Sequence, residues 1–135
     1  MDKIPVFSMQ DSEIKDMLVE YMGKGFLDNI IALFKQDMSL CRFVPDMLGD
    51  ESLRVRLGAT ALVEELYGEY VAELRNAVPG IIALLKHGNP TIRGDAAYVL
   101  GIIKDESARE ALVACLHDSN LSVREVASDA LAQIG

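Results

Sequence analysis

Residues 116–131 read LHDSNLSVREVASDAL, and this stretch decides the fold class because it joins a turn to the first turns of a regular helix. Asp118 and Asn120 are residue types that favour turns and helix N-caps. After them, Val123 and Ala127 are four positions apart, so they share one face of a helix. The stretch therefore predicts a turn followed by an amphipathic helix.

The same pattern occurs twice more, at residues 55–63 and 92–101. Each copy starts with a β-branched residue followed by Arg, has Ala four positions after the β-branched residue, and has a small residue at five. Small residues on this face let a neighbouring helix approach closely. A recurring unit of this length indicates a repeat architecture. The spacing is shorter between the second and third copies than between the first and second, which fits an extension at residues 67–70.

A short apolar segment precedes the later copies, at residues 78–85 and 111–116, and a turn follows each. Each unit is therefore predicted to be helix–turn–helix. Residues 1–38 lack the repeat. We expect them to form two capping helices, the first capped by Asp11 or Ser12, that cover the open end of the stack. The prediction is one domain over 1–135, with three helix-pair repeats in 39–135.

The motif L-x-D-x-N-x-x-V-R-x-x-A-S-x-A-L at residues 116–131 resembles HEAT-like repeats, specifically the short type first noted in phycobilin lyases. The resemblance covers residues 39–135 and implies an all-α solenoid of about three helix pairs. In that family the turn Asp and the helix Arg form a hydrogen-bond ladder along the stack. By position, the resemblance implies the pairs Asp50 with Arg56 and Asp118 with Arg124. In the middle repeat, which contributes Arg93, His87 stands where the Asp is expected.

Helical periodicity also predicts which residues of the second helices face outward, onto the concave side of the solenoid. Apolar side chains there are surrounded by acidic ones, a pattern typical of a protein-binding hot spot with a polar rim. We interpret Tyr98 as an anchor and the acids as a preference for a basic or helical partner segment. An idle face, or one covered by the chain's own extension, is the alternative. The predicted binding residues are Leu57, Ala61, Glu65, Asp95, Tyr98, Ile102, Glu125, Val126 and Asp129.

Composition narrows the classes of partner and compartment. The net charge is −8 and no segment is basic, so neither nucleic acid nor an anionic membrane surface is an expected partner. No apolar run reaches the roughly 20 residues that span a bilayer, and residues 1–7 lack a signal-peptide pattern. Cys41 and Cys115 lie in apolar helical contexts, which favours buried thiols in a reducing compartment. We expect a cytoplasmic protein.

Catalytic and cofactor chemistry find little support in the sequence. His87 and His117 lack the further ligands of a metal site, and no Ser or Cys lies in a nucleophile motif. We predict a non-catalytic scaffold or adaptor without a cofactor. The alternative, implied by the resemblance, is an accessory subunit or chaperone-like lyase that acts on a cofactor-bearing protein.

The last predicted helix is not followed by a polar capping helix in this sequence. Its outer side is expected to expose part of an interface suited to another repeat. We therefore hypothesise homo-oligomerisation or partner docking through the C-terminal repeat.

Overall fold

The computed structural model describes residues 9–135, and that part of the chain is built from α-helices and short 3₁₀ turns without a strand. The 3₁₀ turns are Met38–Phe43, Arg75–Ala77 and Glu106–Ala108. The prediction of an all-α fold is confirmed. The α-helices are α1 (Asp11–Gly23), α2 (Leu27–Gln36), α3 (Val44–Leu48), α4 (Leu53–Leu74), α5 (Val78–Leu84), α6 (Pro90–Ile103), α7 (Arg109–Cys115) and α8 (Leu121–Ile134).

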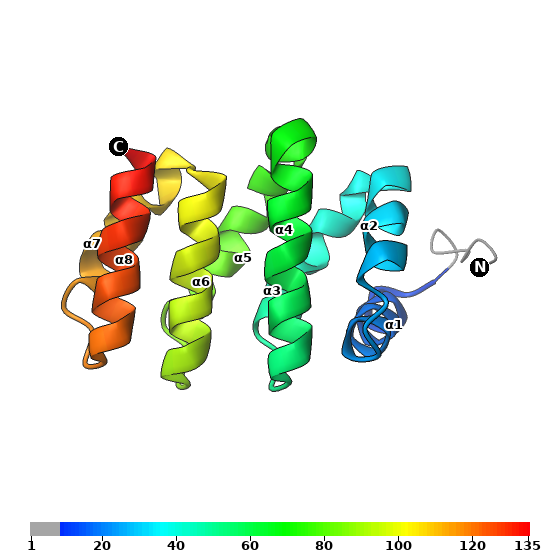
Figure 1. The fold of residues 1–135 in the computed structure, drawn as a ribbon, viewed down its shortest axis with the longest axis horizontal. Coiled ribbons are helices and arrows are strands. Elements are labelled where there is room, and N and C mark those ends of the chain that lie inside the picture. Colours follow the sequence, from blue (N-terminus) through cyan, green and yellow to red (C-terminus); the bar gives the residue numbers. More distant parts are fainter. Residues whose placement is uncertain (1–8) are drawn as a thin grey trace.

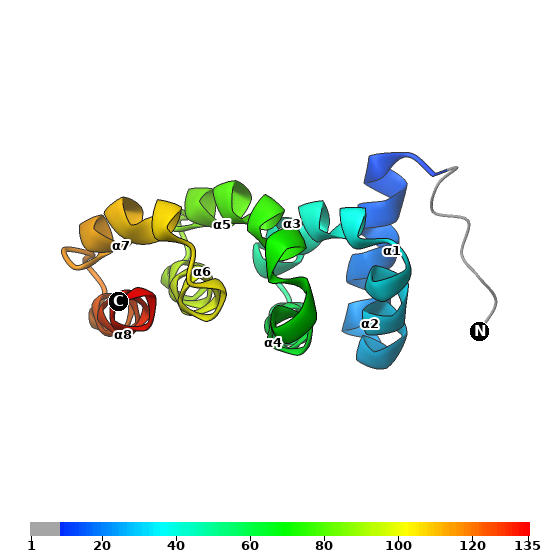
Figure 2. The same cartoon turned by 90° about the horizontal axis from the view of Figure 1, so that it is seen from above.

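Three helix pairs, α3–α4, α5–α6 and α7–α8, follow one another along the long axis of the molecule (Figure 1). Seen from above, the short first helices form one layer and the longer second helices form the other (Figure 2). The layer of α4, α6 and α8 lies on the inside of a shallow arc, so the second helices line the concave side as predicted. This arrangement is an α-solenoid.

Each second helix begins where a polar side chain caps it. Ser52 accepts a hydrogen bond from the N–H of Val55, at the start of α4. Asn89 caps α6 by accepting from Thr91 N–H at 2.9 Å, with Pro90 as the first helical residue. Asn120 fills the same role for α8. These caps fix where the helices start and hence which residues share a face.

The helix pairs pack through the seam of small residues that the sequence predicts. Ala59, Ala96 and Ala127 are all fully buried. Helices α6 and α8 approach each other closely, and a Cβ added to Gly101 would stand 2.9 Å from the Cα of Ala130. A side chain at position 101 would push these helices apart, so this glycine sets their spacing.

The extension predicted at residues 67–70 lengthens α4, which continues to Leu74 through a kink. Tyr70 has a non-helical backbone conformation there, with φ −126° and ψ 29°. The extra turn explains the longer spacing between the first two repeats.

Helices α1 and α2 close the N-terminal end of the stack (Figure 2). The first cap differs from the prediction, because the N-cap of α1 is Gln10, whose N–H donates to the carboxylate of Glu13 at 3.1 Å. Buried Met22 of α1 fills the space above Gly58 of α4. Residues 1–8 of the predicted cap lie outside the described residues. Within residues 9–135, no helix is both long and apolar enough to cross a bilayer.

Candidate functional site

The concave layer rests on a ladder of arginines, one at the start of each second helix. Arg56 on α4 donates from Nη1 to the main-chain carbonyls of Asp50 and Glu51, each at 2.9 Å. Its Nε donates at 3.0 Å to the carboxylate of Asp95, on α6 of the following repeat. Arg56 is the only charged residue among residues 9–135 that is buried. Its donors therefore need these acceptors.

Arg93 repeats this arrangement one step along. Its Nη1 donates to the carbonyl of His87 at 2.8 Å, and Nε and Nη2 form a two-pronged pair with the carboxylate of Asp118, at 2.9 and 3.0 Å. Hydrogen bonds from Arg93 and from the N–H of Asn120 lower the pKa of Asp118. Arg56 and Arg93 therefore each tie their own turn to the next repeat.

The ladder differs from the expected pairing in one respect. Arg56 and Arg124 do contact the turn residues Asp50 and Asp118, but through the main-chain carbonyls, and the carboxylate of Asp118 serves the arginine of the preceding repeat. In the middle repeat, His87 accepts from Asn89 N–H through Nδ1, as the turn aspartates accept from residues two positions on. It offers no carboxylate to Arg56.

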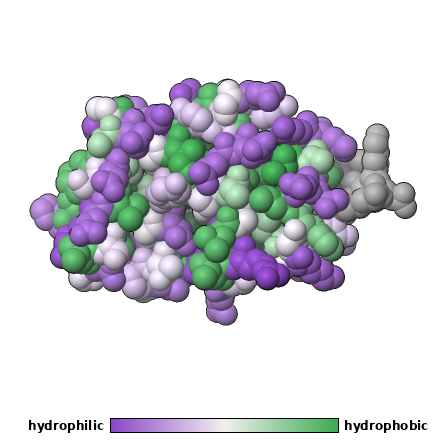
Figure 3. Space-filling view, in the orientation of Figure 1, coloured by the Kyte–Doolittle hydropathy of each residue, from purple (hydrophilic) through white to green (hydrophobic). Residues whose placement is uncertain are grey.

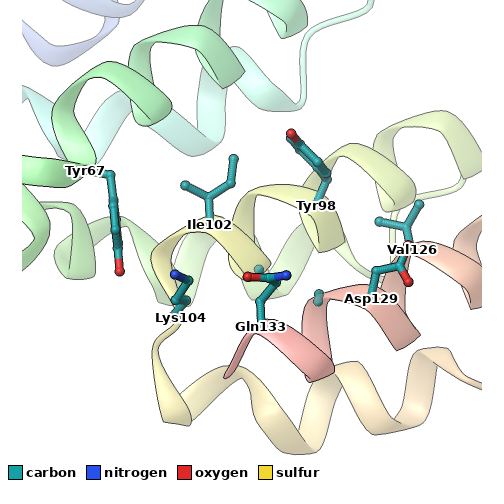
Figure 4. A pocket seen from close by; sticks show the side chains of 9 residues that line it. Tyr67, Tyr98, Ile102, Lys104, Val126, Asp129 and Gln133 are labelled. Carbon is teal, nitrogen blue, oxygen red and sulfur yellow. The ribbon is translucent and has the colours of Figure 1, made fainter. Parts of the chain in front are cut away.

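A groove of about 390 Å³ opens on the concave side, between α6 and α8 and beside the end of α4. Figure 4 shows the side chains around it: Tyr67 from α4, Tyr98, Ile102 and Lys104 from α6 and its C-cap, and Val126, Asp129 and Gln133 from α8. Tyr98 is 50% exposed. The Lys104 ammonium lies 5.5 Å from the centre of the Tyr67 ring, so a cation–π contact forms one wall.

Comparison with known proteins identifies the architecture. The sequence profile of HEAT repeats matches residues 46–132, well over half of the chain. The chain belongs to the HEAT-repeat family. No curated protein matches this HEAT-repeat chain.

Among solved structures, this HEAT-repeat chain is similar to the designed armadillo repeat protein YIII(Dq)4CqI, with 16% identity and a TM-score of 0.54. The match covers 95% of this chain and 60% of that one. This chain thus spans about three fifths of the length of that structure. At this identity the likeness supports the solenoid fold alone.

The HEAT stack brings four of the predicted binding residues to the groove: Tyr98, Ile102, Val126 and Asp129. Asp95 lines an adjoining groove with Gly94 and Tyr98, but its carboxylate is engaged by Arg56. Glu125 is exposed on α8 and does not line either groove.

The remaining predicted residues lie on α4, where Leu57 is 61% exposed, Ala61 is half-buried and Glu65 is exposed. Figure 3 views the face of the second helices, on which hydrophobic patches alternate with hydrophilic side chains. Leu57, Ala61 and Glu65 do not line the groove between α6 and α8.

Sequence reasoning missed Tyr67 and Lys104 as groove residues. Tyr67 falls in the extension of α4, which has no counterpart in the other repeats. Lys104 follows the last residue of α6 and takes a left-handed conformation, with φ 59°. The sequence does place Lys104 in the linker between two repeats, at the rim of the concave face, and this position could have identified it as a groove residue.

Outside the groove, the described thiols are buried and the possible metal-ligand side chains lie too far apart to form a site. Cys41 and Cys115 are free and buried, and burial raises the pKa of both thiols, that of Cys41 to about 11. Within residues 9–135, no group of three or more His, Cys, Asp or Glu side chains is arranged to hold a metal. The arrangement on the concave side is suited to binding.

Proposed function

We propose that this HEAT-repeat protein is a non-catalytic scaffold or adaptor that binds a partner segment on its concave face. The observation that carries the proposal is the groove between α6 and α8, in which Tyr98, Ile102 and Val126 present apolar surface that the fold leaves partly exposed. A large aromatic side chain held on a rigid helix beside a pocket is a usual binding anchor. An apolar side chain of the partner would fill the groove against Tyr98.

The unpaired acids of the second helices support a basic segment as the partner. Asp129 and Glu125 on α8 and Glu65 on α4 are exposed, and no base among the described residues pairs with them. A Lys or Arg of the partner would gain charge-assisted hydrogen bonds there. An extended or helical segment fits the shallow, open shape of the concave side.

The ion pairs and the thiols bear on the proposed class of partner and on the proposed compartment. Arg42, Arg75 and Arg109 each pair with an acid, and the ladder occupies Arg56 and Arg93. With these bases paired and a net charge of −8, we propose a partner that is neither nucleic acid nor an anionic membrane. The free, buried thiols fit a reducing compartment, and we place the protein in the cytoplasm.

The test places a photo-crosslinking amino acid at Ile102 of the full chain, expressed in its native cells. We expect one or a few proteins to be captured, with the crosslinked peptide carrying Lys or Arg near its apolar contact. Tyr98→Ala should weaken binding by roughly thirtyfold and so reduce capture, because a central aromatic anchor contributes about 2 kcal/mol to binding.

The matched control is Phe26→Ala, which removes a similarly exposed aromatic ring, 44% accessible, from the N-terminal end of the stack. This variant should leave capture unchanged. Equal capture by the Tyr98→Ala chain and the unmodified chain, with both folded by circular dichroism, would refute the groove as the binding site.

A second function, assistance to a cofactor-bearing protein, draws on the two tyrosines of the groove, because aromatic rings stack on flat conjugated ligands. Incubation with a bilin, followed by gel filtration, distinguishes it from the scaffold function. Visible absorbance that travels with the protein and disappears in Tyr98→Ala would favour this second function.

A further inference from the structure

Lys104 combines a backbone conformation that suits glycine with a side chain that lies in the groove. It is the only residue other than glycine among residues 9–135 with a positive φ, 59°. A left-handed backbone brings the Cβ of an L-amino acid close to the following carbonyl oxygen, so glycine is the usual residue there. The corresponding place of the third repeat, 31 residues on, holds Gly135, also with a positive φ. The chain therefore keeps a side chain at position 104 where the backbone alone would favour glycine.

The ammonium group of Lys104 lies in the groove without an acid beside it. Its Nζ atom is 5.5 Å from the centre of the Tyr67 ring, and both residues line the groove. None of the acids within residues 9–135 forms an ion pair with Lys104, and the neighbouring Asp105 pairs with Arg75 at 3.7 Å instead. The aromatic ring positions the positive charge but does not neutralise it. The ammonium group is therefore available to a carboxylate.

Asp129 supplies the opposite charge on the other side of the groove. Figure 4 shows Lys104 at the end of α6 and Asp129 on α8, on opposite sides of the pocket. Asp129 is exposed and forms no ion pair with a base of the described chain. Tyr98 and Ile102 present apolar surface to the same groove. The groove thus offers an apolar surface with one unpaired cation and one unpaired anion.

We propose that Lys104 is a specificity-determining residue of the groove and that it binds a carboxylate of the partner segment. This inference rests on the proposed concave-face function and specifies its ligand. The segment would carry an apolar anchor that packs against Tyr98, a base that faces Asp129 and an acid that faces Lys104. A segment with bases alone would bring like charges together at Lys104. The partner segment therefore carries both charges, one on each side of its apolar residue.

The experiment uses the full chain to select from a displayed library of peptides, each with one fixed Leu and randomised residues on both sides. Peptides that bind the unmodified chain but not the Tyr98→Ala chain occupy the groove. Among these we expect an acid on one side of the Leu and a base on the other. Lys104→Gln should remove the preference for the acid, and Lys104→Glu should replace it with a preference for a second base.

Fluorescence anisotropy of one selected peptide measures the size of the effect. Changing the acid of the peptide to its amide should weaken binding to the unmodified chain about fivefold, which is the upper end for an exposed ion pair. The same change should not alter binding to the Lys104→Gln chain, and Lys104→Arg should retain the preference for the acid. The matched control is Lys35→Gln, which neutralises an exposed lysine of α2 outside the groove and should leave the affinity unchanged.

Lys104→Gly separates a binding role from a structural one. Glycine relieves the left-handed backbone, and this gain exceeds the loss of an exposed cation–π contact with Tyr67. The urea midpoint should therefore not fall, although the preference for the acid should be lost. A lower midpoint with the preference intact would show that Lys104 only supports the fold, and would overturn the proposal.

The selection also distinguishes failure of this inference from failure of the concave-face function. Peptides that depend on Tyr98 but lack the acid, or that keep the preference for it with Lys104→Gln, would overturn the role of Lys104 alone. If none of the selected peptides depended on Tyr98, the proposed function would fail, and this inference would fail with it.

Discussion

Replacing Gly101 by Ala should destabilise the protein, although the same change at Gly94 in the same helix should stabilise it. Both glycines lie inside α6. Alanine favours a helix interior by about 1 kcal/mol relative to glycine, so propensity alone predicts the same gain at both positions. The surroundings differ, because a Cβ at Gly94 meets nothing within 4 Å, whereas a Cβ at Gly101 meets the backbone of α8.

The magnitude at Gly101 follows from that contact. The new Cβ would stand 2.9 Å from Ala130 Cα and 3.0 Å from Ala130 Cβ. Neither atom is the end of a flexible side chain, so α6 and α8 must separate. Overpacking of this kind costs about 1–3 kcal/mol, which cancels or exceeds the gain in helix propensity. The two variants should therefore differ by roughly 1–3 kcal/mol in the free energy of unfolding.

Urea unfolding followed by circular dichroism measures this difference. With a slope of about 2 kcal/mol/M, the midpoints of the two variants should lie roughly 0.5–1.5 M apart, with Gly94→Ala higher. Adding Ala130→Gly to Gly101→Ala should recover only part of the loss, because the Cα of residue 130 remains. Equal stabilisation by both alanines would refute the conclusion that Gly101 sets the spacing of α6 and α8.

Three further predictions concern the ladder and the thiols. The hydrogen bond from Arg93 lowers the pKa of Asp118. This carboxylate therefore stabilises the fold above the ordinary carboxyl pKa of about 3.9, and the stabilisation is lost as the pH falls through its folded pKa. Urea unfolding measured from pH 7 to pH 2 should show a shallower loss of stability for Asp118→Asn than for the unmodified protein. Asp95→Asn should lower the free energy of unfolding by roughly 1–3 kcal/mol, because it leaves the buried guanidinium of Arg56 without its acid. Adding His87→Asp should recover part of this loss, as measured by the urea midpoint of the double variant. Because burial raises the pKa of Cys41 to about 11, the folded protein should react slowly with a thiol reagent at pH 8 until denatured, and its stability should fall as pH rises from about 8.5 towards 11.

Much of the solenoid could be predicted from the sequence because its determinants are local and repeated. Caps such as Asn89 and Asn120 start the second helices, and alanines four positions after the β-branched residue fill the seam. Three copies of one pattern also constrain each other, because a helix assignment that fits one copy must fit the other two. The predicted concave layer and the family follow from this regularity.

The partners of individual side chains could not be predicted in the same way, because they depend on the rotation between successive repeats. Periodicity places Asp95 on the outer side of α6, where it reads as a free acid. Only the stacking of α4 on α6 shows that Arg56 reaches it. The position of Tyr67 at the groove likewise depends on the kinked extension of α4, which no other repeat shares.

The reassignment of Asp95 changes what a bound segment would encounter. Arg56 pairs with this acid, and the carboxylate that lines the groove is that of Asp129 on α8. Lys104 lies at the C-terminal end of α6 and supplies positive charge to the same groove. The groove thus has opposite charges on its two helices. A partner segment with a basic residue next to its apolar anchor would bind in the orientation that places this base towards α8 and away from Lys104, and the reversed orientation would bring two like charges together.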